Sequence, residues 1–175
     1  MHLRRWAAAL LAAFALVAAG ATPAQAAPRI LYYDAGQAQE FVAVVNQGAN
    51  IWNARVANVQ LRPVPAGRTP NIRVLADNGW PRTQTTSLGN GRWWMGREAV
   101  NDGYYPPRIA AHEFGHILGL PDRRTGLCTD LMSGSSAPPS CRNAFPNAAE
   151  AAQVDRLFAG AAVASTPARV DAFVF

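Results

Sequence analysis

The sequence of 175 residues contains no lysine, and charged residues make up only 15% of it. All 16 of its lysine-or-arginine positions are arginine, against 11 acidic residues. From Arg29 onwards the arginines are scattered singly, and only Arg123 and Arg124 are adjacent. Proteins that bind nucleic acids gather their basic residues into a patch or stripe. This pattern therefore argues against a nucleic-acid partner, and the lysine-free composition suggests a GC-rich bacterial genome.

The sequence also has no long apolar run beyond its first 26 residues. Arg4 and Arg5 precede an apolar run from Trp6 to about Ala19, and Ala24–Ala26 reads as an A-x-A cleavage site. This combination is typical of a secretory signal peptide, and the run is too short and too rich in alanine to predict a membrane span. We therefore expect residues 1–26 to be removed and the protein to be secreted.

The remaining chain of about 149 residues is the length of one domain and is enough to bury a substantial core. It keeps 14 arginines and 11 acidic residues, so its formal charge falls from +5 to +3. We expect residues 27–160 to form the domain and residues 161–175 to be a C-terminal extension of unknown role. The mature protein is expected to be a monomer without membrane association.

Histidine is scarce as well, and its placement is the strongest functional signal. Outside the predicted signal peptide only His112 and His116 remain, in the segment HEFGHILGLPD. On a helix, residues four apart lie about 40° apart around the axis and about 6 Å along it, so both imidazoles can reach one metal ion. Glu113 projects beside them, close enough to hydrogen-bond a water on that metal.

A turn after this helix can supply a third ligand. Gly119 tolerates the left-handed backbone that ends helices, and Pro121 prevents the helix from resuming. The turn can bring Asp122 back to the two histidines and leave the fourth position of a tetrahedral zinc ion open for water. This donor set suits zinc best, although other divalent first-row metals can occupy it.

The alternative is a chance HExxH on an ordinary amphipathic helix with two buried, hydrogen-bonded histidines. The helix does have an apolar side opposite the polar one. That side consists of Ala110, Ala111, Phe114, Ile117 and Leu118. The additional Gly119 and Asp122 at the required offsets favour the metal site.

The run His112, Glu113, His116, Gly119 and Asp122 resembles the extended zinc motif of the metzincin endopeptidases. The aspartate in place of a third histidine resembles the snapalysins, small neutral metalloproteinases secreted by bacteria. The similarity covers roughly residues 28–160. It includes the segments Gly48–Asn53, Asn58–Arg62, Leu131–Gly134 and Pro146–Ala148. The resemblance implies that Met132 forms the methionine turn beneath the metal, whereas a methionine there could also simply fill an apolar gap.

The pattern of elements and the resemblance together predict an α+β, metzincin-like domain. It would have a twisted mixed sheet of four to five strands, a long N-terminal helix, an active-site helix under the sheet, and a small loop-rich lower part with a C-terminal helix. Hydrophobic periodicity predicts strands at 29–33, 59–62, 72–74 and 92–96. Helices are predicted from Asp34, as a capping-box start, to about Arg55, from Pro107 to Leu118, and from Asn147 to Phe158.

The strand Arg92–Gly96 is predicted to be an edge strand that binds the substrate backbone, as the resemblance implies. Trp93 and Trp94 point to opposite faces of this strand, so only one can pack in the core. The other is expected to line the cleft or lie on the surface.

Cys128 and Cys141 are the only two cysteines, and export places them where disulfides persist. They could instead bind metal, but the predicted ligand set is already complete without them. We expect a disulfide that closes a short loop containing Met132 and contributes about 3 kcal/mol.

These observations predict a secreted zinc-dependent metalloendopeptidase that acts on protein or peptide substrates. A zinc-bound water would attack the peptide bond, with Glu113 as general base. A zinc hydrolase of a non-peptide amide or ester and an inactive zinc-stabilised binding module are the alternatives. Glu113 argues against the binding module, because a structural zinc site prefers four protein ligands and needs no base.

Two features depart from the family pattern. The oxyanion-stabilising tyrosine of several metzincins has no counterpart after Met132, and Arg123 or Arg124 could take its place. The snapalysin calcium site would fall where this chain has Tyr105–Pro107, which does not favour Ca²⁺ binding. Asp102 is the nearest alternative carboxylate.

Overall fold

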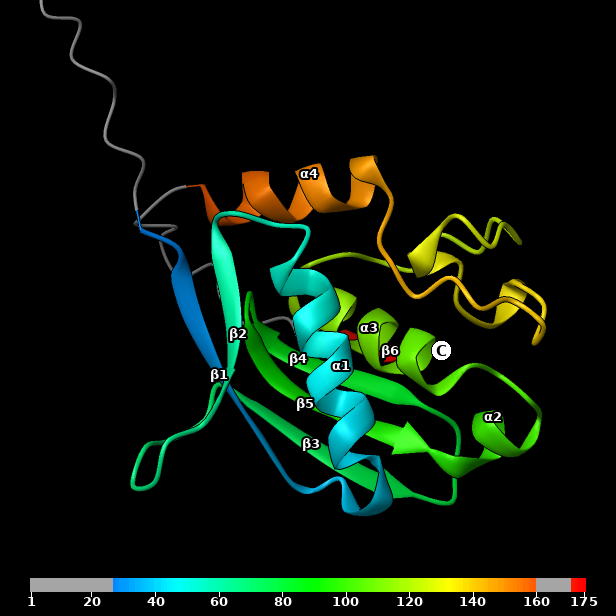
Figure 1. The fold of residues 1–175 in the computed structure, drawn as a ribbon, viewed down its shortest axis with the longest axis horizontal. Helices are drawn as coiled ribbons and strands as arrows, with labels where there is room; N and C mark the ends of the chain where they lie inside the picture. Colours follow the sequence, from blue (N-terminus) through cyan, green and yellow to red (C-terminus); the bar gives the residue numbers. More distant parts are fainter. Residues whose placement is uncertain (1–26, 160–170) are drawn as a thin grey trace, which may run out of the picture.

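The computed structural model describes residues 27–159 and 171–175. The predicted signal peptide and residues 161–170 of the predicted extension lie outside these ranges. The described residues form an α+β domain in which helices pack on one face of a mixed sheet (Figure 1). The predicted fold class is confirmed, with six strands instead of four or five.

The sheet has the order β2-β1-β3-β5-β4-β6. All strand pairs are parallel except those that β4 makes with β5 and with β6, which are antiparallel. The strands are β1 (Arg29–Gln37), β2 (Val59–Pro63), β3 (Ile72–Asp77), β4 (Arg82–Ser87), β5 (Asn90–Gly96) and β6 (Asp171–Val174). The helices are α1 (Val42–Asn53), α2 (Arg97–Asn101), α3 (Pro106–Ile117) and α4 (Ala148–Phe158), with short 3-10 helices η1 (Gln39–Phe41) and η2 (Leu131–Ser136).

Alternating side chains of the strands build the core against α1 and α3. The buried positions on the inner face include Leu31, Ile72, Val74, Trp93 and Met95. Apart from the buried Gly96, their neighbours along the strands face the other side of the sheet, where they are exposed or half-buried. This period of two is what a sheet covered on one face requires.

Trp93 is fully buried, whereas Trp94 lies on the outer face under the guanidinium groups of Arg82 and Arg92. The prediction that only one of the two tryptophans packs in the core is confirmed. Trp94 lies on the surface of the sheet, on the face opposite the helices.

Helices α1 and α3 cross at very short range. The backbone of Gly48 lies so close to α3 that a Cβ there would be 2.9 Å from the Ala110 Cβ and 3.0 Å from the Ala110 carbonyl carbon. Trp52 donates a buried hydrogen bond of 2.7 Å to the carbonyl of Ala111. Tertiary packing therefore holds the glycine-containing turn of α1 in its helical conformation.

Helix α4 confirms the predicted C-terminal helix. Its Asn147 and Glu150 form a reciprocal capping box. Its Asp155 accepts hydrogen bonds from the backbone N–H groups of Ala57 and Asn58, which fixes the helix beside the start of β2.

The predicted helix start at Asp34 is wrong. Residues 34–37 continue β1, and the Asp34 carboxylate accepts from the Gly36 N–H instead of capping a helix. The helical segment begins with η1 at Gln39, because the pairing of β1 with β3 extends to Gln37 and Leu75.

The prediction that Arg92–Gly96 is an edge strand is also wrong. Strand β5 lies inside the sheet between β3 and β4. Strand β4, which was not predicted, lies next to β5, and β6 from the C-terminal extension pairs with its other side and forms the edge of the sheet. We call residues 171–175 the tail segment.

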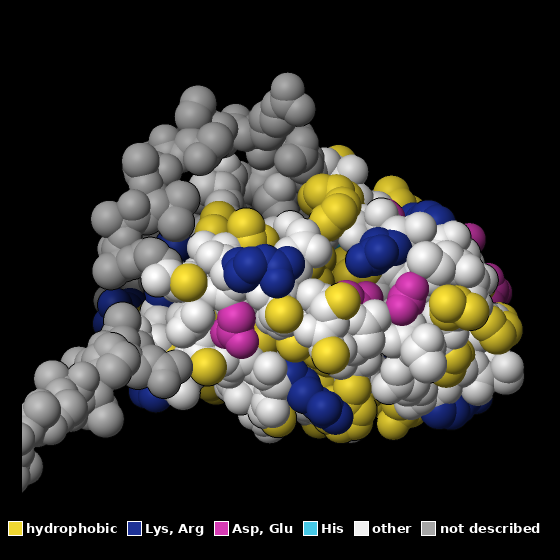
Figure 2. Space-filling model, turned by 90° about the horizontal axis from the view of Figure 1, so that it is seen from above, with side chains coloured by type: hydrophobic (Ala, Val, Ile, Leu, Met, Phe, Trp, Pro, Cys, Tyr) yellow, Lys and Arg dark blue, Asp and Glu magenta, His cyan; other side chains and the backbone are white. Residues whose placement is uncertain are grey.

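Among the described residues, no helix has the length and apolar character needed to cross a membrane. Arginine and acidic side chains lie interspersed on the face shown in Figure 2, without a continuous basic stripe there. The absence of a nucleic-acid partner stays a prediction.

Gly48→Ala should lower stability although alanine is the better helix former. Alanine would gain about 1 kcal/mol of helix propensity, but the added methyl group must push α1 away from α3. We expect a net loss of about 1–3 kcal/mol in the free energy of unfolding, measured by urea denaturation. Gln47→Ala, on the exposed side of α1, should change it by less than about 0.5 kcal/mol. An increase in stability for Gly48→Ala would contradict the close helix crossing.

Candidate metal centre and active site

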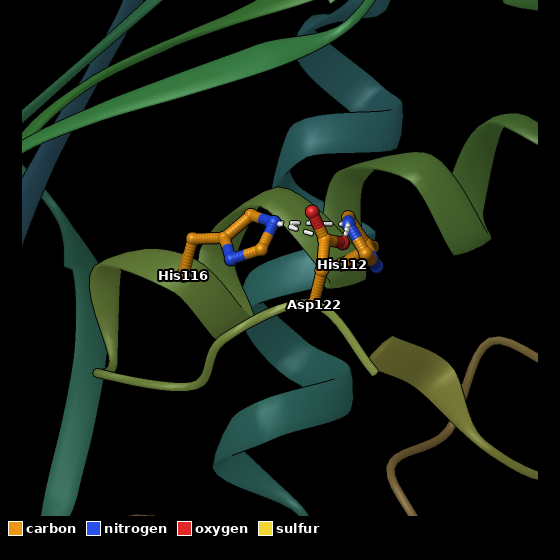
Figure 3. Close-up of side chains that lie close together, drawn as sticks. All are labelled: His112, His116 and Asp122. Atoms are coloured by element: carbon orange, nitrogen blue, oxygen red, sulfur yellow. Dashed lines mark hydrogen bonds and ion pairs between the residues drawn. The ribbon is translucent and has the colours of Figure 1, made fainter. Parts of the chain in front are cut away.

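The structure brings His112, His116 and Asp122 together at the end of α3 (Figure 3). Helix α3 begins with two prolines after Tyr105, a favourable start because proline lacks the N–H that the first helical turn leaves unpaired. Its apolar side, which includes Phe114 and Ile117, is fully buried. The opposite side presents the two histidines, which are themselves buried.

The turn after α3 delivers Asp122, as predicted. Gly119 has a φ of 94°, a left-handed conformation that ends the helix. The Asp122 Oδ1 then lies 3.3 Å from His112 Nε2 and 3.7 Å from His116 Nε2. Among the described residues, this is the only group of three or more potential ligand side chains close enough to share an ion.

The hydrogen bonds of the two imidazoles determine their tautomers. His112 Nδ1 lies 3.0 Å from the Leu131 carbonyl, and His116 Nδ1 lies 2.8 Å from the Leu120 carbonyl. A carbonyl only accepts, so each Nδ1 must carry a proton and donate it. In a neutral imidazole the other nitrogen, Nε2, then has a free lone pair. Burial is the largest cause that lowers the pKa of His116 to about 3, with a smaller electrostatic contribution from the neighbouring His112, so this ring is neutral near pH 7.

The atoms His112 Nε2, His116 Nε2 and Asp122 Oδ1 face one another and can together bind a cation. The two Nε2 atoms are 3.0 Å apart, and the buried Asp122 Oδ1 has no hydrogen-bond partner among the described residues. Lone pairs that converge in this way repel one another unless a positive charge lies between them. Two imidazoles oriented by backbone carbonyls and one carboxylate are a donor set typical of catalytic zinc.

Glu113 lies next to this centre and is fully buried. Its Oε2 accepts a 2.5 Å hydrogen bond from Thr83 on β4, while Oε1 is buried without a partner in the described part of the chain. Burial raises the pKa of Glu113 to about 7, against the smaller opposing effects of His112 and Thr83. A carboxylate with this pKa and one free oxygen can accept and return a proton near neutral pH.

Met132 lies beneath the centre, in η2. It is fully buried, and a Cβ on Gly115 of α3 would be only 2.5 Å from its sulfur. The adjoining Leu131 carbonyl is the group that orients His112. The short turn of η2 therefore supports both the floor of the site and the position of one imidazole.

Glu150 holds this turn from α4. Its carboxylate accepts from the backbone N–H groups of Leu131 at 3.2 Å, Met132 at 2.8 Å and Asn147 at 2.8 Å. Only 1% of Glu150 is exposed, so these three donors replace the water it has lost.

Arg108 and the disulfide fix the loop around η2. Arg108 is buried on α3 and donates to the carbonyls of Cys128, Asp130 and Asn143. Cys128 and Cys141 form the predicted disulfide. The loop that carries Met132 is thus bound to α3 through Arg108, to α4 through Glu150, and closed by its own disulfide.

Of the two arginines considered for oxyanion stabilisation, Arg124 has its guanidinium at the site. It donates to Asp122 Oδ2 at 3.1 Å and to Ser135 at 2.8 Å. Although partial burial raises the pKa of Asp122, contacts with the two histidines and with Arg124 outweigh burial and lower it. Arg123 is exposed, and its backbone N–H pairs with the Met132 carbonyl.

The carboxylate considered for calcium, Asp102, is exposed at the end of α2. Tyr105 and the two prolines after it serve to start α3.

Sequence reasoning missed Thr83, Glu150 and Arg108. Thr83 lies in a strand whose polar sequence, RTQTTS, carries little hydrophobic signal. Glu150 stands three residues after Asn147, a spacing that marks a capping box but does not reveal the contact with η2. Nothing in the local sequence distinguishes Arg108 from a solvent-exposed arginine.

Comparisons with known proteins show which family the chain belongs to. Residues 29–161 match the family described as the Streptomyces extracellular neutral proteinase (M7) family. The chain is 39% identical over 141 residues to the extracellular small neutral protease of Streptomyces sp. (strain C5), which covers 79% of this chain and 60% of that protein. It is 37% identical over 139 residues to the protein of the same name from Streptomyces lividans, covering 79% of this chain and 61% of that protein.

The protein of the same name from Streptomyces caespitosus is 39% identical over 128 residues, which are 73% of this chain and 95% of that protein. The matched region thus spans nearly all of this relative but only about 60% of the length of the other two. The resemblance predicted from the HEFGHILGLPD segment is confirmed.

Glu150→Gln should destabilise the fold. The amide would direct an NH₂ group at backbone donors, leaving at least one buried N–H without an acceptor. We expect the free energy of unfolding to fall by about 1–3 kcal/mol in urea denaturation. Glu98→Gln, at an exposed position of α2, should change it by less than about 0.5 kcal/mol. Equal effects of the two substitutions would show that the Glu150 contacts with η2 contribute nothing.

Proposed function

Because the chain belongs to the Streptomyces extracellular neutral proteinase (M7) family, we propose that it is a secreted zinc-dependent metalloendopeptidase. Residues 1–26 direct export and are removed, and residues 27–160 form the peptidase domain. His112, His116 and Asp122 hold a single zinc ion, and Glu113 is the general base. Proteins or peptides are the substrates, as the names of the relatives suggest.

The observation that carries this proposal is the convergence of three unshared donor atoms beside a buried carboxylate. Both Nε2 atoms and Asp122 Oδ1 face one point. Glu113 has one oxygen held by Thr83 and the other without a partner among the described residues. A structural zinc site needs four protein ligands and no base, so the arrangement supports catalysis.

Zinc, when bound, supplies a Lewis acid that polarises the scissile carbonyl and makes a water molecule more acidic. Glu113 Oε1 accepts the proton of the attacking water and then donates it to the leaving amine. Thr83 holds Oε2, so the carboxylate keeps Oε1 directed into the site. Met132 supports the site from below, and Arg124 lies where it can stabilise the oxyanion that develops during attack.

Glu113→Ala should abolish casein digestion without loss of zinc. Removal of the base should lower kcat/KM by about 10²–10⁴-fold, because general base catalysis is lost while the three ligands remain. Casein digestion and zinc content are measured on the same purified samples. Glu98→Ala, which removes an exposed carboxylate, should leave both unchanged.

Addition of a chelator should stop digestion by the unsubstituted protein. Casein cleavage that survives the chelator or the loss of Glu113 would contradict the zinc-peptidase proposal. Retained zinc with no hydrolysis of any substrate would favour a binding module, and cleavage of esters but not of casein would favour a non-peptide hydrolase.

Asp122→Ala should weaken zinc binding more than the loss of a residue that only orients a zinc ligand. Removing a group that only orients a ligand costs about 10–100-fold in metal affinity, so removing a direct ligand should exceed about 100-fold. Competition with a zinc-sensitive dye measures the affinity. Asp102→Ala is the matched control and should bind zinc as the unsubstituted protein does. Equal affinities for both variants would show that Asp122 is not a ligand.

A further inference from the structure

The tail segment lies beyond residues 29–161, which match the family, and it packs directly on the catalytic side chains. Residues 171–174 form β6, antiparallel to β4, with Phe173 paired to Thr83 and Val174 paired to Arg82. Phe175 continues the pairing through its N–H, which donates to the Pro81 carbonyl at 3.0 Å. In Figure 1 this short strand lies by α3, close to the point marked C.

The two phenylalanine rings of the tail segment contact the two proposed zinc ligands. Phe173 stacks on His116, with ring centroids 4.3 Å apart and planes 7° apart. Phe175 meets His112 at 4.9 Å in an edge-to-face arrangement. Such aromatic contacts are favourable beyond the apolar area that they bury.

Phe175 is also the best-anchored residue of the tail segment. Only 2% of it is exposed, and its ring contacts Trp80 and Tyr104. Its carbonyl oxygen accepts from Trp80 Nε1 at 2.7 Å and from Ser135 Oγ at 2.9 Å. Phe175 is therefore held in a pocket of side chains at the end of β4, next to Pro81, where the strand pairing of the tail segment stops.

Arg124 adds a polar contact to the tail segment. Its guanidinium bonds Asp122 and also donates to the Val174 carbonyl. The residue that the proposed function places at the oxyanion therefore already binds a peptide carbonyl, that of the tail segment.

These contacts leave no room for a substrate. His112, His116 and Glu113 are at most 1% exposed with the tail segment in place. An extended peptide that binds by adding a strand needs the free edge of β4, and β6 uses that edge. Access to Glu113 therefore requires the tail segment to leave.

We propose that the tail segment is an autoinhibitory strand, which occupies the β4 edge and covers the active site until it is displaced. This inference rests on the proposed peptidase function. The occupant of the edge is a part of the same chain, so inhibition is intramolecular and independent of protein concentration. The active fraction equals the fraction of molecules in which the tail segment is released.

The test uses the full chain with the double substitution Phe173→Ser and Phe175→Ser. The matched control is Ala172→Ser with Val174→Ser, because both of these residues are exposed on the opposite side of the strand. Release of the tail segment should raise kcat/KM for casein by at least about tenfold, while the control stays within about twofold of the unsubstituted chain. Zinc content should be equal in all three proteins.

Amide hydrogen exchange of residues 82–87 provides a readout that does not depend on activity. In the Phe173/Phe175 variant, the amides of β4 that point toward β6 should exchange at least about tenfold faster than in the unsubstituted chain. A synthetic peptide with the sequence of residues 171–175, DAFVF, should restore their protection and inhibit casein digestion competitively, whereas a scrambled peptide should do neither. Far-UV circular dichroism verifies that the double variant is folded. The single substitution Phe173→Ser, which disturbs the packing less, is measured in the same way as a second variant.

Faster exchange without any gain in activity would overturn the inhibitory role, and unchanged exchange in both phenylalanine variants would overturn the docking itself. If none of the proteins digests casein although exchange responds as expected, the proposed peptidase function is the part that fails. The two failures are thereby distinguished.

Discussion

The arrangement of the site, and of the elements packed around it, depends on how the imidazoles of His112 and His116 are oriented. Each Nδ1 donates to a backbone carbonyl in a turn, Leu131 for His112 and Leu120 for His116. These two bonds turn both Nε2 lone pairs inward, and the same chain reversal at Gly119 carries Asp122 to face them. Three donors with no proton between them are stable only around a cation, so the fold must hold them by packing until one binds. This requirement accounts for the rigid surroundings of the site: a glycine-mediated crossing of α1 and α3, a methionine against Gly115, and a buried glutamate behind η2.

The loop below the site is firmly held, whereas the strand above the site, β6, can be displaced. The floor is made by covalent and buried polar links, namely the disulfide, Arg108 and Glu150. The strand β6 covers the site from above; it has four residues and, within the described part of the chain, pairs with β4 alone. Local openings draw on the least anchored elements of a fold. The side of the domain from which we propose that substrate approaches is therefore also the side where opening should cost least free energy.

The sequence predicted which residues gather at the candidate site better than it predicted the edge of the sheet. The grouping of His112, His116 and Asp122 beside Glu113 follows from helical geometry and one turn, which are local properties. The strands with alternating apolar residues were also recognisable. Strand β4 was missed because its buried positions are Thr83 and Thr85, which pack against the inner face without an apolar signature. Strand β6 exists through pairing with residues about ninety positions earlier, which no local pattern encodes. Asp34 was misread because its carboxylate can close a turn at Gly36 as readily as it can cap a helix.

The composition of the tail segment bears on how it would inhibit. Residues 172–175 are Ala, Phe, Val and Phe, so none of these side chains can bind a metal ion. Phe173 lies flat on the His116 ring and Phe175 meets His112 edge-to-face, while both Nε2 atoms face Asp122. The tail segment therefore competes with substrate for the β4 edge and for the space above the histidines, not with zinc for its ligands. Such a strand can leave and return without loss of the metal, which makes the inhibition reversible. It also covers an edge that would otherwise be open to pairing with other chains.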